Sequence, residues 1–144
     1  MYEYEPVVRR VREEVIVVMQ QGDDRRAIRR AVRMQVLNAL NEMEITAIGV
    51  QQIAHHALRG AFEAAERAQR PVEVVIEEAS EGVLEAVKEK GGKAAQHLKE
   101  AIQGGIAALE EYGASLKEKA SDAAEKSRQA LQSLIDRLKA SLRA

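Results

Sequence analysis

An uncharged stripe that repeats every eleven residues is the feature that most constrains this sequence. Counting from Ile28 in steps of four, four and three residues visits 32 positions up to Leu142, and none is charged although 31% of the chain is. Eleven residues per three helical turns is about 3.67 residues per turn, which differs from the 3.5 of a left-handed coiled coil. The spacing therefore predicts an all-α fold, either an elongated bundle of long helices or a straight to right-handed coiled coil.

Small side chains fill much of this stripe. The chain has 24 alanines but one Phe, three Tyr and no Trp, so few large residues are available to fill a core. We expect the stripe to pack helices closely together or to lie on another surface. The residues that we assign to this self-association or surface stripe are Val83, Val87, Leu98, Ile102, Leu109, Leu116, Leu131, Ile135, Leu138 and Leu142.

We predict one elongated helical domain in three parts: an N-terminal helix over 1–22, a long Arg-bearing helix over 23–70, and Lys/Glu-rich repeat helices over 71–144. Residues 15–18 (VIVV) would also suit a strand, but the charges before them do not alternate as a strand requires, so helix is favoured.

Helix ends are predicted from local signals. Gly22 is typical of a helix end, and either Asp23 or Asp24 is typical of an N-cap for the next helix. We expect one unbroken helix from about 24 to 69, which Pro71 ends or kinks. A break at Gly91-Gly92 and a last helix to about 142 complete the prediction.

The charges divide into two segments of opposite sign. Residues 9–33 carry eight Arg and four acids, a net of +4, whereas residues 73–111 carry nine Glu and four Lys, a net of -5. We expect these segments to attract each other within or between chains, in a folded-back or antiparallel assembly. Before residue 72 every basic residue is Arg, and after it eight of eleven are Lys, which suggests two functional halves.

After residue 72 the charges follow an order around the helix. At about 98° per residue, Lys and Arg lie mostly beside the stripe and the acids nearly opposite it. Glu77, Glu81 and Glu85 share one face, which we interpret as solvated. Cations beside an apolar face suit a helix in a lipid or polymer interface, but they also border ordinary helix–helix seams. Both roles are compatible if a bundle opens to expose its seam.

No catalytic or metal-binding constellation is evident, so we predict a protein that is not an enzyme and has no metal or other cofactor. The chain has no cysteine. His55 and His56 project about 100° apart on a helix, and neither they nor His97 follow a glutamate by three residues, as a di-iron bundle would require.

Gly49, Gly60, Gly82 and Gly104 recur at multiples of eleven residues. Each costs about 1 kcal/mol of helix stability relative to Ala. Their recurrence has three interpretations: the backbones of neighbouring helices approach closely at these points, the helices are locally weakened there, or the repeat was inherited and has no function.

The repeat region, about residues 72–142, resembles three protein groups: exchangeable apolipoproteins, late-embryogenesis-abundant proteins and bacterial phasins, which coat polyhydroxyalkanoate granules. The segments that carry the resemblance are Gly82-Val-Leu-Glu-Ala-Val-Lys-Glu-Lys and Ala107-Ala-Leu-Glu-Glu-Tyr-Gly-Ala-Ser-Leu-Lys-Glu-Lys-Ala. Apolipoprotein repeats carry more prolines, and late-embryogenesis proteins are more hydrophilic than residues 7–53. The phasin resemblance implies a cytoplasmic bacterial protein that self-associates and coats an apolar surface. Residues 24–66 are also similar to helical proteobacterial proteins of no assigned activity.

Our leading functional hypothesis is therefore a non-enzymatic, self-associating helical protein with a structural or surface-coating role, a homo-oligomer that binds lipid or polymer granules. The alternative is a scaffold or adaptor bundle whose segment 25–33 docks on an acidic protein or nucleic acid. Its anion-binding residues would be Arg25, Arg26, Arg29, Arg30 and Arg33. Nucleic acid is the less favoured partner because the net charge is -1 and no aromatics interleave with the arginines. We expect no signal peptide, no transmembrane segment and a cytoplasmic location.

Overall fold

The computed structural model describes residues 2–22, 24–119 and 121–143, and this part of the chain is helical, with no strand. The predicted all-α class is confirmed. The helices are α1 (Glu5–Gln20), α2 (Arg25–Glu42), α3 (Ala47–Ala68), α4 (Val72–Lys90), the short α5 (Gly92–Gln96), α6 (Leu98–Lys117) and α7 (Asp122–Arg143).

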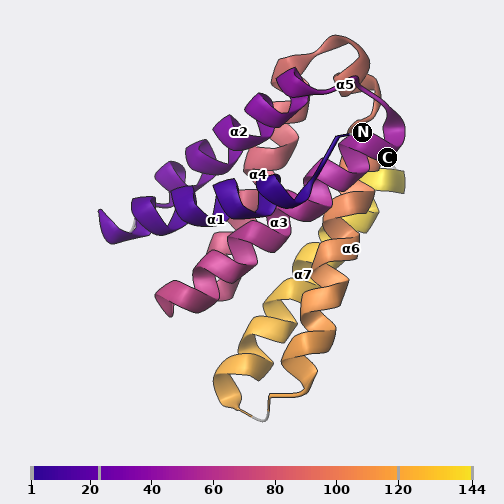
Figure 1. Ribbon diagram of the computed structural model, residues 1–144. Coiled ribbons are helices and arrows are strands. Elements are labelled where there is room, and N and C mark those ends of the chain that lie inside the picture. Colours follow the sequence, from indigo (N-terminus) through magenta and orange to yellow (C-terminus); the bar gives the residue numbers. More distant parts are fainter. Residues whose placement is uncertain (1, 23, 120, 144) are drawn as a thin grey trace.

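The six longer helices form three hairpins, α1–α2, α3–α4 and α6–α7, which fan out side by side (Figure 1). Each hairpin stacks on the next, with α1, α3 and α6 in one layer and α2, α4 and α7 in the other. Helices within a layer run parallel. For α2 and α4 this orientation is evident from two ion pairs, Arg25–Glu77 and, further along both helices, Arg33–Glu89. The track from residue 28 to 142 is thus a folded stack of hairpins and not a single rod.

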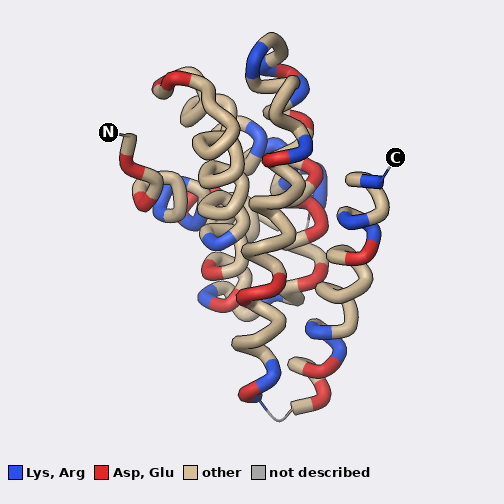
Figure 2. Tube along the Cα trace, turned by 90° about the vertical axis from the view of Figure 1, so that its right-hand side faces the viewer, with Lys and Arg blue, Asp and Glu red and all other residues tan. Residues whose placement is uncertain are grey.

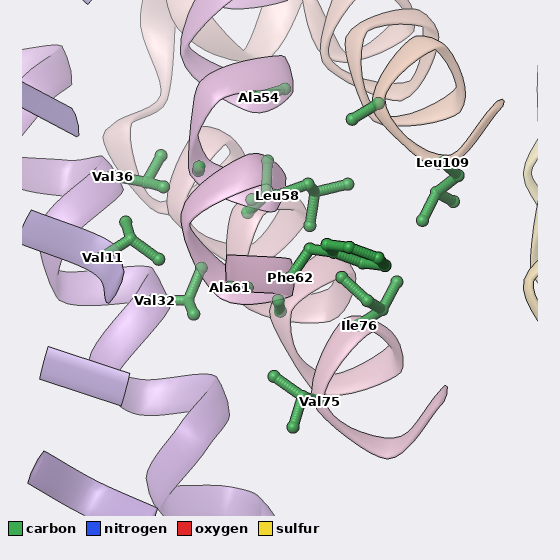
Figure 3. Close-up of a cluster of buried hydrophobic side chains, with 14 of the residues drawn as sticks. Val11, Val32, Val36, Ala54, Leu58, Ala61, Phe62, Val75, Ile76 and Leu109 are labelled. Carbon is green, nitrogen blue, oxygen red and sulfur yellow. The ribbon is translucent and has the colours of Figure 1, made fainter. Parts of the chain in front are cut away.

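One apolar core runs through the stack, and the eleven-residue stripe supplies much of it. Val32, Leu58, Ile76 and Leu109 are stripe residues at most 1% exposed, and they come from four different helices (Figure 3). Because the stripe keeps its phase through the turns, each successive helix presents the same uncharged face to the interior.

Several predicted helix ends are confirmed. The Asp24 carboxylate accepts a hydrogen bond from the backbone N–H of Arg26, as an N-cap does. Gln69 adopts a left-handed conformation (φ 55°) just before Pro71, which ends α3 as expected. Gly91, at φ 68°, separates α4 from α5.

The prediction of unbroken helices over 24–69 and 92–142 is wrong. Residues 43–46 separate α2 from α3, and the Thr46 hydroxyl caps α3 by accepting from the N–H of Gly49 at 2.9 Å. Likewise, α6 ends at Lys117, and the Ser121 hydroxyl accepts from the N–H of Ala124 in the first turn of α7. Neither break contains Pro. The sequence signal for each break is instead a hydroxyl side chain that can cap the following helix.

Candidate interaction surfaces

Three of the recurring glycines lie where parallel helices touch backbone to backbone. A β-carbon on Gly82 of α4 would lie 2.6 Å from the carbonyl oxygen of Arg29 in α2. At Gly60 of α3 it would collide with the Val8 carbonyl of α1, and at Gly104 of α6 with the Gln51 carbonyl of α3. Among the three interpretations of the glycine repeat, these positions support close backbone approach.

The spacing of these three glycines is 22 residues, and each belongs to the later helix of its pair. Gly49 differs, since its neighbours include Met43 and Thr46 from the turn just before its own helix. The glycine repeat therefore sets how closely successive hairpins stack. Without a side chain at these points, adjacent helices come near enough for Ala and Val to fill the interface.

The basic and acidic segments meet along α2 and α4, as the charge pattern predicts. Arg29 reaches three carboxylates, at 3.6 Å to Glu78, 3.1 Å to Glu81 and 3.4 Å to Glu85. Arg33 lies 2.6 Å from Glu89. The attraction acts within one chain, between parallel helices, and every one of these pairs lies beside the close contact at Gly82.

The acidic face of α4 is partly solvated, as we interpreted Glu77, Glu81 and Glu85, but its carboxylates also form ion pairs. Each of the three pairs with an arginine of α2. Glu78 is buried, at 7% exposure, and accepts from the Nε of Arg25 at 3.1 Å. A face opposite an apolar stripe can thus form a second, polar interface when another helix covers it.

The five arginines proposed as an anion-binding set therefore divide into two groups. Arg25, Arg29 and Arg33 are engaged by carboxylates of α4. Arg26 and Arg30 face outward, and Arg30 lies 3.8 Å from Asp24. With Arg29, Arg33 and two glutamates, they line a shallow groove of about 440 Å³.

The ten residues of the self-association or surface stripe lie within the fold of this one chain. Eight are buried, from fully covered Leu109 to Leu138 at 8% exposure, and Leu98 and Leu142 are partly buried. They belong to α4, α6 and α7. Contact of the eight buried residues with another molecule requires the helices to separate.

Among neighbouring helices within each layer, α4 and α7 pack least extensively against each other. At one end a groove of about 480 Å³ lies between the α3–α4 turn and the α6–α7 turn, with Pro71 and Glu73 on one side and Lys119 and Ala124 on the other. A similar groove of about 340 Å³ lies at the same end of α2 and α4. Further along, a cavity of about 10 Å³ lies among Leu58 of α3, Ser80 of α4, Ile102 of α6 and Leu138 of α7. The Ser80 hydroxyl is buried and has no hydrogen-bond partner. Packing forces thus hold α7 to α4 less strongly than α4 to α2.

A stacked aromatic pair joins α3 to α6. The rings of Phe62 and Tyr112 are parallel, within 3°, and their centroids lie 3.6 Å apart. Burial strongly raises the pKa of the Tyr112 hydroxyl, which has no hydrogen-bond partner. The sequence contains too few aromatics to show this pairing, and residue spacing alone did not indicate it.

The adjacent histidines contact different parts of the fold. His55 lies 2.8 Å from Glu111 of α6, whereas the Nδ1 of His56 lies 2.7 Å from the carbonyl oxygen of Gln52. The ring of Tyr4 covers His56, with centroids 5.5 Å apart. Burial lowers the pKa of His56, and the nearby His55 and Arg59 lower it further.

Across the described residues, no group of three or more His, Cys, Asp or Glu side chains is arranged to hold a metal ion. None of the helices there has the length and apolar character needed to cross a membrane. Comparison with known proteins found no matching family model, no matching curated protein and no matching solved structure.

Proposed function

We propose that this protein is a non-enzymatic helical bundle that opens its hairpins to self-associate and to coat an apolar surface, in the manner of a phasin. The observation that carries the proposal is the course of the uncharged stripe, which passes through successive helices and is covered only by other helices of the same chain. Separating α7 from α4 and α6 exposes a continuous apolar face formed by uncharged stripe residues.

The cations beside the stripe support the same role. Arg128 and Lys139 lie about 60° to 80° from the apolar centre of α7 on a helical wheel, and both are partly buried. Their stems can cover apolar surface while their charged ends reach anionic groups or water. The proposal includes a cytoplasmic location. The coated body is a lipid or polymer granule.

The alternative function, docking of segment 25–33 on an acidic partner, has less support. Arg26 and Arg30 are the outward members of that segment, whereas Arg25, Arg29 and Arg33 already bind carboxylates of α4. An acidic partner would have to compete with these internal pairs. Strong binding to an acidic peptide or nucleic acid that is lost in Arg26→Glu/Arg30→Glu would favour this second function.

Co-sedimentation of the whole chain with phospholipid vesicles and with polyester granules tests the coating function. We compare Leu142→Lys with Ala140→Lys, because both add one cation near the end of α7, the first in the stripe and the second on the exposed side. Leu142→Lys should weaken sedimentation at least fivefold, and Ala140→Lys should leave it unchanged. A monomer by light scattering that binds neither surface would overturn the proposal.

A further inference from the structure

The stacking of hairpins is regular up to α6 and changes at α7. Among the six longer helices, glycines at 60, 82 and 104 each allow one helix to touch the helix two places earlier. A fourth glycine at the same interval would be residue 126, in α7, but this position is Lys126. The α4–α7 pair therefore lacks the glycine contact that joins α2 to α4, and these two helices are the least extensively packed neighbours within a layer.

Few polar contacts compensate for the missing close approach. Between α4 and α7 the described residues form a hydrogen bond of 3.0 Å from Ser127 to Glu73 and a longer ion pair of 3.8 Å between Arg137 and Glu77. Arg137 is largely exposed, and exposed pairs contribute little. The buried, unpartnered hydroxyl of Ser80 under Leu138 further disfavours the closed arrangement, because its lost hydration is not replaced.

The side chains of α7 are suited to a helix that separates from the bundle and remains helical. Several of its polar contacts are internal: Glu125 pairs with Arg128 and accepts from Gln129, and Gln132 donates to Asp136. These contacts persist when α7 separates from its neighbours. The apolar side of α7 is formed by Leu131, Leu134, Ile135 and Leu138.

We infer that α7 is the element that leaves the bundle and lies on the target surface, while α1–α4 keep their fold. This inference rests on the proposed coating function and specifies its mechanism and partner. The helix carries five cations and three acids, with Arg128 and Lys139 beside its apolar side. The partner that fits this face is an apolar–water interface bearing anionic groups, for which anionic phospholipid vesicles are the probe.

A chemical cross-link between α4 and α7 tests the inference, and the absence of native cysteine makes the two introduced thiols unique. We join Glu73→Cys and Ser127→Cys with a short bis-maleimide. The matched control joins Glu5→Cys and Arg59→Cys, which links α1 to α3 where the native side chains lie 3.0 Å apart. Cross-linking of the first pair should reduce binding to anionic vesicles at least tenfold, whereas cross-linking of the control should leave it within twofold.

The outcomes separate the inference from the proposed function. If the wild type and both uncross-linked variants bind, but the α4–α7 link has no effect, the coating function stands and the inference is wrong. If the wild type binds no vesicle or granule, both are wrong. Hydrogen exchange of the free chain gives an independent measure: α7 amides should exchange at least tenfold faster than those of α2 and α4, and equal rates would overturn the inference.

Discussion

The hairpins α1–α2 and α3–α4 are held together differently from the hairpin α6–α7. The first two share glycine contacts between backbones and a row of Arg–Glu pairs along α2 and α4. The last hairpin contacts α3 through Gly104 of α6. Its outer helix α7 lies at one edge of the molecule (Figure 2) and packs only loosely against α4. Similar apolar periodicity thus produces a tight and a loose interface in one chain.

The difference shows which residues determine the strength of an interface when the apolar pattern is constant. The stripe places uncharged residues inward in both regions. The α2–α4 pair has a glycine at the contact point and a row of Arg–Glu pairs beside it, whereas the described residues of α4 and α7 form one long, exposed ion pair and have no such glycine. The change from Arg to Lys after residue 72 coincides with this difference.

The largest expected effect is loss of a core leucine, and it should depend on the region. Leu40 is 1% exposed, and Leu40→Ala should lower the free energy of unfolding by about 4 kcal/mol. Leu138 is 8% exposed and borders the α4–α7 cavity, so Leu138→Ala should lower it by about 2 kcal/mol. Urea titration followed by circular dichroism measures both. Equal losses would mean that the two regions are packed equally well.

A methyl group at a glycine contact should open the tight region. Gly82→Ala should lower the free energy of unfolding by about 2 kcal/mol, because the added carbon meets the backbone of Arg29 at 2.6 Å. Gly113→Ala is the control, since nothing lies within 4 Å of a β-carbon there. The control should be stabilised by up to about 1 kcal/mol through helix propensity. A stabilised Gly82→Ala would refute the role of close approach.

Removal of Arg29 should weaken α2–α4 more than removal of Arg137 weakens α4–α7. Arg29→Met keeps the apolar stem and should lower stability by about 1 kcal/mol, because the ion pairs are partly exposed and screened. At about 1 M NaCl most of this difference should disappear. Arg137→Met should change stability by less than about 0.5 kcal/mol. Thermal melts at low and high salt distinguish these expectations.

Ser80→Ala should tighten the loose region. The substitution removes a buried hydroxyl that has no partner, so the free energy of unfolding should rise by about 1 kcal/mol. In the same variant, hydrogen exchange of α7 should slow while that of α2 stays the same. Ser127→Ala is the opposing control, because it removes the hydrogen bond to Glu73 and should speed exchange of α7. Faster exchange in Ser80→Ala would contradict this account of the seam.

The smallest expected effect is a pH dependence in the N-terminal part. Burial lowers the pKa of His56 below its ordinary value of about 6.5. The unfolded chain therefore binds a proton more readily at this residue, and the folded state loses stability as pH falls below about 6.5. Between about pH 8 and pH 5 the melting temperature of the wild type should drop further than that of His56→Gln. Parallel curves for the two proteins would show that His56 contributes nothing.

Much of the fold follows from the sequence because periodicity and charge act over whole helices. The all-α class, the inward stripe and the attraction between the Arg and Glu segments are physical consequences of patterns that repeat many times. Pro71, Gly22 and Gly91 also mark helix ends through local backbone preferences. These features do not depend on knowing which helices are neighbours.

The missed features depend on tertiary neighbours or on single capping residues. The breaks before Thr46 and Ser121 were hidden because the apolar phase continues through them. Glu78 is buried because α2 covers the acidic side of α4, which no single-helix wheel can show. The Ser80 hydroxyl lacks a partner because it faces an apolar cavity lined by residues of α3, α6 and α7, and the Phe62–Tyr112 stack joins residues 50 positions apart.

The parallel stacking of hairpins has a consequence for how the chain folds as it is synthesised. Polar links between neighbouring hairpins join described residues 49 to 60 positions apart, from Lys90–Asn41 through Arg12–Glu63 to Arg137–Glu77. The entropy lost on closing each loop is therefore nearly the same at every step, since it varies slowly with loop length. Each hairpin can dock as soon as it leaves the ribosome. We expect the N-terminal four helices to be assembled before α7 has been made.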